Sequence, residues 1–158
     1  MDTEGHVIGQ HVPASITGWP GPRSLDELGR LSWIPVETEL QAQRWDALMD
    51  EEHFLGAGPL VGRRLRYLVR SSRYGDIAAF SFSAAAWRLQ PRDAFIGWSP
   101  EQREAQLQRV VCNSRFLIRS DIQVPELASH LLAKTLRRLP QDWAARYAEA
   151  PVLVETFV

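Results

Sequence analysis

Cysteine is almost absent from the sequence, since Cys112 is the single one in 158 residues. An internal disulfide is therefore excluded, no cysteine pair has metal-ligand spacing, and a reducing compartment is indicated. Long apolar runs are also missing, because no stretch reaches the roughly 20 residues that cross a bilayer, and the N-terminus lacks the pattern of a secretory signal. We therefore expect a soluble, cytoplasmic protein with no membrane contact.

Lysine is nearly absent as well. Of the 18 cationic residues, 17 are arginine and one is Lys134, and the net charge is −1. A chain so close to neutral has no bulk attraction to nucleic acid or membrane, so any such attraction must come from local clusters. Arginine supplies planar, bidentate donors for carboxylates and phosphates, but genomic base composition can produce the same bias.

The motifs of several common chemistries are missing too. The chain contains no P-loop, no G-x-G-x-x-G, no H-E-x-x-H, no paired C-x-x-C and no G-x-S-x-G. Common nucleotide, zinc and hydrolase chemistries therefore lose their sequence support, and no metal site is expected. We expect Cys112 to be a buried packing residue at the end of a helix.

The length and the hydrophobic fraction of 45% predict one packed globular domain. Residues 1–23 are rich in glycine and proline and show little periodicity. We therefore expect residues 1–37 to form an N-terminal arm with a short helix, and residues 38–158 to form the domain.

Apolar periodicity, capping residues and turn residues predict the order of the elements. In the hairpin, Leu65, Tyr67 and Val69 are expected on one face and the arginines on the other. The expected elements are a capped helix over Ser24–Arg30, a connector through Trp33 and Pro35, a helix over Thr38–Glu52 with a Thr38–Gln41 capping box, an antiparallel hairpin over Arg63–Arg70 and Ile77–Ala85, a short strand at Phe95–Gly97, a helix over Ser99–Val111, a strand over Asn113–Ile118, a helix over Pro125–Leu139 and a strand over Pro151–Val158. This order predicts an α/β or α+β domain, with a mixed central sheet and flanking helices.

His53 follows three carboxylates at the end of the first long helix. A carboxylate–histidine pair can transfer protons or form half of a metal site. A solvated acidic helix end produces the same pattern. Further along the chain, we expect the adjacent Arg92 and Asp93 to be local polar anchors.

The hairpin is the most basic region of the chain, with Arg63, Arg64, Arg66 and Arg70. Arginines grouped in this way can contact phosphates. Arg137 and Arg138, beside Lys134 on the later helix, are candidates for the same role. The alternative is a solvated sheet face opposite the acidic helix end.

Asn113 and Arg115 occupy alternate positions of a predicted strand and are expected to share a face. We expect Arg115 to anchor a carboxylate such as Glu155 across the sheet. Both side chains could instead line a ligand cleft. Glu155 is either solvent-facing or a catalytic base.

Several segments in fixed order resemble a bacterial family described as a domain of unknown function, which includes a component of the Druantia anti-phage system and transposase-associated domains. The resemblance covers about residues 38–158 and implies a DNA-associated accessory role in a mobile element or in defence. Its segments are HFLG (His53–Gly56), FSFSAAAWRLQPRD (Phe80–Asp93), IGW (Ile96–Trp98), NSRFLI (Asn113–Ile118), LASHLL (Leu127–Leu132) and PVLVETFV (Pro151–Val158).

The element order also resembles the Gcn5-related N-acetyltransferase fold. That resemblance implies an acyl- or group-transfer enzyme, with His53 or Glu155 as the base and an acyl-CoA pyrophosphate held by the backbone of Leu127, Ala128 and Ser129. The sequence departs from the acetyltransferase pattern, because the turn QVPELAS has no glycine and Glu126 adds negative charge there.

Members of the bacterial family usually continue beyond the ETFV segment, whereas this sequence ends at Val158. We therefore expect an acetyltransferase-like sheet that lacks its C-terminal strands and an exposed last strand. A partner protein or a second copy of the chain could pair with that strand. This leaves a third interpretation, in which the chain is a non-catalytic interaction module completed by its partner.

Overall fold

The computed structural model describes residues 20–59 and 61–157, so the expected N-terminal arm lies outside the described residues up to residue 19. In chain order the elements are the 3-10 helix η1 (Asp26–Leu28), β1 (Leu31–Pro35), α1 (Glu39–Glu52), β2 (Arg64–Ser71), β3 (Gly75–Ala84), α2 (Gln90–Ile96), α3 (Pro100–Gln106), the 3-10 helix η2 (Leu107–Arg109), β4 (Val110–Ile118), α4 (Leu127–Tyr147) and β5 (Leu153–Thr156).

The strands form one five-stranded sheet in the order β1-β2-β3-β4-β5. The first three pairings are antiparallel and β4 pairs with β5 in parallel. A parallel pair needs a crossover connection, and α4 supplies it. The predicted mixed sheet with flanking helices is confirmed.

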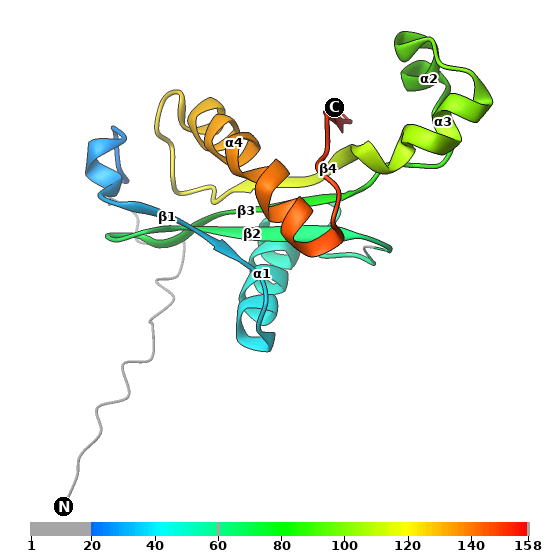
Figure 1. Cartoon of the computed structure of the whole chain (residues 1–158). Coiled ribbons are helices and arrows are strands. Elements are labelled where there is room, and N and C mark those ends of the chain that lie inside the picture. The colour runs from blue at the N-terminus through cyan, green and yellow to red at the C-terminus, as the bar shows by residue number, and fades with distance from the viewer. Residues whose placement is uncertain (1–19, 60, 158) are drawn as a thin grey trace, which may run out of the picture.

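The helices α4 and α1 cover opposite faces of the sheet (Figure 1). Leu65, Tyr67 and Val69 of β2 belong to the core on the α4 side, whereas Leu68 belongs to the core with Trp45 of α1. The predicted alternation of β2 is therefore confirmed, because side chains of a strand point alternately to its two faces. The sheet is the middle of three layers.

The first long helix begins as predicted. Thr38 accepts a hydrogen bond from the Gln41 backbone, and the Gln41 side chain bonds back to the Thr38 backbone. This capping box satisfies N–H groups that have no partner within the helix. Trp45 then anchors the helix, since its side chain is 0% exposed and its Nε1 donates to the Phe80 carbonyl at 3.1 Å.

The expected connector through Trp33 and Pro35 is wrong, because Leu31–Pro35 forms β1. Trp33 lies opposite Val69 of β2, and its Nε1 donates to Thr135 Oγ1 of α4 at 2.8 Å. Proline is tolerated at the end of an edge strand, where its missing N–H costs no ladder bond. The sheet therefore begins before residue 38.

The expected strand at Phe95–Gly97 is also wrong, because Phe95 and Ile96 are the last residues of the helix α2 and Gly97 is its C-cap. Gly97 has a φ of 74°, the left-handed geometry that commonly ends helices. The capping box of Ser99 with Gln102 is confirmed, but α3 ends at Gln106. The expected helix over Ser99–Val111 is therefore too long.

Cys112 lies on β4, in the sheet, and it is buried as predicted. It was expected at a helix end, but the β-branched Val110 and Val111 instead start β4, opposite Leu153 and Val154 of β5. Burial raises the pKa of the Cys112 thiol to about 11, and the charge of Glu155 adds to the shift. The thiol is therefore protonated at neutral pH.

The helix α4 starts two residues later than predicted and ends eight residues later, since it covers Leu127–Tyr147 rather than Pro125–Leu139. Pro140 lies inside it, and Trp143 beyond Pro140 is 1% exposed in the core. Proline removes one helical hydrogen bond. Burial of Trp143 stabilises the extra turns and offsets that loss.

Ala148 ends α4 in the left-handed conformation, with a φ of 59°, and its N–H donates to the Ala144 carbonyl at 2.8 Å. We expect Ala148→Gly to raise the free energy of unfolding by about 0.5–1 kcal/mol in a urea titration, because glycine adopts this conformation without steric cost. In the matched control Ala145→Gly, at an exposed site inside the helix, the free energy of unfolding should fall by about 1 kcal/mol. A lower stability of Ala148→Gly would contradict this account of the helix end.

Candidate functional site

The start of β2 is an open edge of the sheet. β1 ends with Pro35 opposite Tyr67, so Arg64 has no strand beside it on that side among the described residues. Tyr147, at the end of α4, covers this edge: its hydroxyl accepts the Arg64 N–H at 2.7 Å and donates to the Arg64 carbonyl at 2.8 Å. Strand and helix are thereby joined at their ends.

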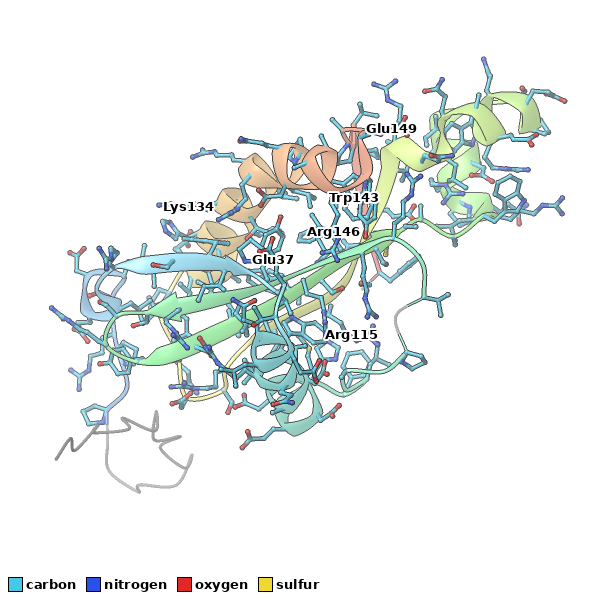
Figure 2. The ribbon with its side chains drawn as sticks, turned by 60° about the horizontal axis from the view of Figure 1, so that its bottom comes forward. Glu37, Arg115, Lys134, Trp143, Arg146 and Glu149 are labelled. Carbon is cyan, nitrogen blue, oxygen red and sulfur yellow. The ribbon has the colours of Figure 1, made fainter. Side chains whose placement is uncertain are left out.

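Four arginines lie near the start of β2 and the end of α4, and we call Arg63, Arg64, Arg66 and Arg146 the Tyr147 patch. The Arg66 guanidinium lies on the α1 side, 5.2 Å from the centre of the Trp45 ring. The guanidinium carbons of Arg63 and Arg146 lie 5.4 Å and 5.9 Å from the centre of the Tyr147 ring. In Figure 2, Arg146 lies between the end of α4 and the strands. Arg63 and Arg146 are both exposed to solvent.

Arg66 links the patch electrostatically across the sheet edge. Burial lowers the pKa of Arg66, and the positive charges of Arg64 and Arg146 lower it further, while the carboxylate of Asp46 opposes the shift. Asp46 bonds Arg66 at 3.0 Å. The open edge lets arginines from both sides of the sheet come within electrostatic range of one another, where the four arginines outnumber the carboxylates of Asp46 and Glu39 that act on Arg66.

The other predicted phosphate-contacting residues lie elsewhere. Arg70 is paired with Asp76 at 2.9 Å, at the far end of β2. Arg138 is paired with Asp142 at 2.7 Å, whereas Arg137 is exposed on α4. The structure thus brings three of the six predicted residues into one patch and adds Arg146.

Arg138 and Asp142 belong to a tether between α4 and β2. The Tyr67 hydroxyl donates to Asp142 Oδ2 at 2.8 Å, and the Arg138 guanidinium lies 5.5 Å from the centre of the Tyr67 ring. Burial, followed by the Asp142 carboxylate, raises the pKa of Tyr67 well above its ordinary value. The hydroxyl therefore stays a hydrogen-bond donor, and we assign this cluster a structural role.

His53, a predicted catalytic base, is the C-cap of α1. Its Nδ1 accepts the Leu55 N–H at 3.2 Å, and its ring stacks on Phe54 at 4.9 Å. Burial and then the charge of Arg115 lower the pKa of His53. The imidazole is therefore neutral at physiological pH, with one nitrogen already occupied as an acceptor.

The acidic residues before His53 hold neighbouring loops. Asp50 Oδ1 accepts the Ala57 N–H at 2.7 Å, and Glu52 Oε2 accepts the Ser120 N–H at 2.5 Å. In residues 20–59 and 61–157, no group of three or more His, Cys, Asp or Glu side chains is placed to hold a metal ion. Asp50 and Glu52 therefore stabilise loops at the end of α1.

The predicted pair of Arg115 with Glu155 is wrong. Arg115 Nε donates to the Gly56 carbonyl at 2.9 Å and its Nη1 to the Ser114 carbonyl at 2.7 Å, so its guanidinium anchors the loop after α1. A bulge between β3 and β4 lies at this point. Asn113 holds the bulge, since its Nδ2 donates to the Ser81 and Arg115 carbonyls. Neither side chain lines the hollow described below.

Glu155, the other candidate base, is 11% exposed and lies 3.5 Å from Arg92 Nη1 of α2. Burial raises the pKa of Glu155, and the charge of Arg92 opposes that shift. Its Oε2 is buried without a hydrogen-bond partner. Since His53 contacts the loop after α1 and Glu155 contacts α2, no described contact joins the two candidate bases.

Arg92 and Asp93, expected as local polar anchors, form the centre of an ionic cluster. The Arg92 side chain is 4% exposed, and its Nε and Nη2 lie 3.0 Å and 2.9 Å from Asp93 Oδ1. Arg92 Nη1 also donates to the Ala86 carbonyl at 2.8 Å. Arg92 thus connects α2 both to the segment after β3 and, through Glu155, to β5.

Asp93 receives hydrogen bonds from three groups. Besides Arg92, Trp98 Nε1 donates at 3.1 Å and Arg103 Nη1 of α3 at 3.3 Å. Desolvation works to raise the pKa of Asp93, but these hydrogen bonds outweigh it and the pKa is lowered. The carboxylate therefore stays ionised, and its hydrogen bonds with Arg92 and Arg103 hold α2 against α3.

The turn predicted to hold an acyl-CoA contains Leu127, Ala128 and Ser129. Leu127 is 1% exposed in the core, whereas Ala128 and Ser129 are exposed in the first turn of α4. Glu126 precedes them with a φ of 64°, and no side chain caps the helix. CoA binding stays a prediction, as does pairing of a second chain with β5.

The structure thus defines a mixed α/β domain, with a helix on each face of its sheet and a cationic patch at one open edge. The chain matches the sequence family described as Druantia protein DruA over residues 25–158, and it belongs to that family. This family identifies it as a component of an anti-phage defence system. No curated protein and no solved structure matches the chain.

Within the described ranges, none of the helices has the length and apolarity needed to cross a membrane.

Sequence reasoning missed Arg146 and Tyr147 as site residues. The sequence signal that could have identified them is the adjacent arginine and tyrosine in the last turn of α4. The start of β2 also combines arginines with a tyrosine.

Proposed function

We propose that this member of the DruA family contacts DNA in anti-phage defence, with the Tyr147 patch gripping the phosphate backbone. The observation that carries the proposal is that four arginines, Arg63 just before β2, Arg64 and Arg66 in β2, and Arg146 in α4, lie near one open sheet edge. A polyanion is the partner that such an excess of positive charge attracts.

The patch has the properties that a phosphate contact requires. Like charges in one patch repel each other, and a bound phosphate removes that repulsion while its oxygens accept bidentate hydrogen bonds from arginine. Asp46 pairs with Arg66, but Arg63 and Arg146 are exposed, with their guanidinium groups over the ring of Tyr147. These two arginines are therefore the ones to test.

Binding of the full chain to a fluorescein-labelled DNA duplex, measured by anisotropy at several salt concentrations, tests the proposal. We expect the affinity to fall steeply with salt, and the slope of log affinity against log salt to shrink by roughly 0.9 for each arginine removed in Arg63→Gln and Arg146→Gln. The matched control is Arg70→Gln, at the far end of the same strand, where Asp76 already occupies the side chain.

Two results would count against the proposal. One is the absence of duplex binding by the wild-type chain at low salt. The other is an equal loss of affinity in Arg70→Gln and in the two patch variants, since that would show a general charge effect with no localised contact.

A further inference from the structure

The helices α2 and α3 form a unit that stands away from the three layers (Figure 1). Arg92 is the one buried residue of α2, and α3 buries none of its residues. The unit and the segment that leads into it expose aromatic side chains, since Trp87, before α2, is 55% exposed and Phe95 of α2 is 86% exposed. These exposed rings are accessible to a ligand that packs against the unit.

A hollow of about 640 Å³ lies on this unit, lined among others by Arg88, Gln90, Trp98 and Arg103. Its size is within the range of about 300–1,000 Å³ that small-molecule sites occupy. It is open to solvent, so a ligand that enters it can continue along the protein surface. The lining is cationic and aromatic, and it includes an amide.

Two of the lining residues, Arg103 and Trp98, each belong to an arginine–tryptophan pair. The Arg103 guanidinium lies 5.9 Å from the centre of the Trp87 ring, and the Arg92 guanidinium lies 5.8 Å from that of Trp98. Each guanidinium takes one face of an indole ring, and Trp87 keeps more than half of its surface accessible. A flat group can therefore stack on Trp87, whose orientation Arg103 supports.

The charges of the hollow suit an anion. Asp93 lies in the lining, but its ion pair with the buried Arg92, 2.9 Å away, balances its charge. Arg103 Nε is buried and has no hydrogen-bond partner. Arg88 is exposed beside Arg103, so two guanidinium groups are placed next to the aromatic surface. The combination fits a ligand with a flat ring and a phosphate.

We propose that the α2–α3 unit binds single-stranded nucleic acid, with a base stacked on Trp87 and the backbone phosphate held by Arg88 and Arg103. A duplex hides the faces of its bases, whereas a single strand exposes them to aromatic side chains. The inference rests on the proposed function in taking DNA as the partner, but it assigns single strands to a second site. Duplex contacts remain with the Tyr147 patch.

Anisotropy of fluorescein-labelled oligothymidylate, dT20, added to the full chain tests the inference. We expect Trp87→Ala to weaken dT20 binding roughly ten- to a hundredfold, because stacking on one aromatic ring has about that effect per base. Arg88→Gln should lower the salt slope by roughly 0.7. The matched controls are Phe54→Ala, an aromatic that is 90% exposed elsewhere, and Arg73→Gln, an exposed arginine beyond β2; both should bind dT20 like the wild type.

The same variants separate this inference from the proposed function. Trp87→Ala should leave duplex binding unchanged, and Arg63→Gln should reduce duplex binding more than dT20 binding. If dT20 binding depends on Trp87 while the duplex does not bind at all, the Tyr147 patch assignment fails and the α2–α3 assignment stands.

The assignment to single strands is overturned if the wild-type chain does not bind dT20, or if Trp87→Ala binds it unchanged. It is also overturned if thymidine monophosphate competes as well as unlabelled dT20 at equal nucleotide concentration, since the site would then take a free nucleotide. Unchanged dT20 binding in both Trp87→Ala and Arg88→Gln would leave the exposed aromatic groups as a surface for a protein partner, and would contradict the proposal.

Discussion

Replacing Arg92 with alanine is expected to release the α2–α3 unit from the sheet while β1–β5 and α4 stay folded. Arg92 is the buried residue of α2, and it bonds Asp93, the Ala86 carbonyl and Glu155. Removal of one partner from a buried ion pair costs roughly 3–5 kcal/mol, because the other charge is left unpaired. This unit has no apolar core that could offset the loss.

Hydrogen exchange of backbone amides measures the release directly. We expect protection in residues 90–106 to fall by roughly a hundredfold or more in Arg92→Ala, while protection in β2 and β3 changes little. Arg88→Ala is the matched control, since Arg88 is exposed on the same unit and surface substitutions change stability by about 0.5 kcal/mol or less. Unchanged protection of residues 90–106 would show that Arg92 is not the anchor.

The loss of stability of the α2–α3 unit in Arg92→Ala should increase with pH. The pKa of Glu155 is already raised by burial in the native state, and removal of Arg92 raises it further. A carboxyl group whose folded pKa lies above its unfolded value stabilises the fold most when protonated, and that contribution is lost as pH rises above about 4.3, the ordinary value for glutamate. The difference in stability between the wild type and Arg92→Ala should therefore be larger at pH 8 than at pH 4.5.

Trp143→Ala is expected to lower the free energy of unfolding of the whole domain by roughly 3–5 kcal/mol, as for other buried tryptophans. Trp143 is 1% exposed and packs in the core between α4 and the sheet, where its ring lies 4.8 Å from that of Tyr147. Its loss leaves a cavity under the last turns of α4. Those turns carry Arg146, so the Tyr147 patch should be disturbed as well.

Urea denaturation followed by circular dichroism measures this effect. Trp87→Ala is the control for loss of an indole group, since Trp87 is 55% exposed, and its stability should change by about 0.5 kcal/mol or less. Trp143→Phe should cost less than Trp143→Ala, because Trp143 Nε1 is buried without a hydrogen-bond partner and no bond is lost with it. A similar small effect in all three variants would contradict a core position for Trp143.

Local features of the fold could be predicted from the sequence. The capping boxes at Thr38 and Ser99 each involve residues three positions apart, so sequence spacing specifies them completely. The alternation of Leu65, Tyr67 and Val69 identified the face of β2 that packs on the α4 side for the same reason, because one period describes the whole strand.

Features that depend on distant partners could not be predicted. β1 is only five residues long and ends in proline, and it forms a strand because Trp33 pairs with Val69 and bonds Thr135, 102 residues away in sequence. A short strand was expected at Phe95–Gly97 where α2 ends, and α2 is held by an ion pair between residues 63 positions apart. Local propensity carries no information on either contact.

The residues of the candidate site likewise include some that the sequence predicted and some that it did not. Arg63, Arg64 and Arg66 were identified because three of four neighbouring residues are arginine. Arg146 and Tyr147 were missed because the hydrogen bond that brings Tyr147 to Arg64 joins residues 83 positions apart. The expected link between Arg115 and Glu155 failed because Glu155 lies opposite Cys112, while Arg115 turns towards the loop after α1.

Contact between DNA and the Tyr147 patch is tested most directly by an NMR titration. It follows the arginine Nε–H signals of the full chain as a DNA duplex is added at low salt. The Nε–H signals of Arg63, Arg64 and Arg146 should shift together and return when salt is raised, because they report the guanidinium groups that bind phosphate. Arg70 and Arg119, which are paired with Asp76 and Asp121, should not shift. Shifts confined to Arg70 and Arg119, or no shifts at all, would contradict the claim.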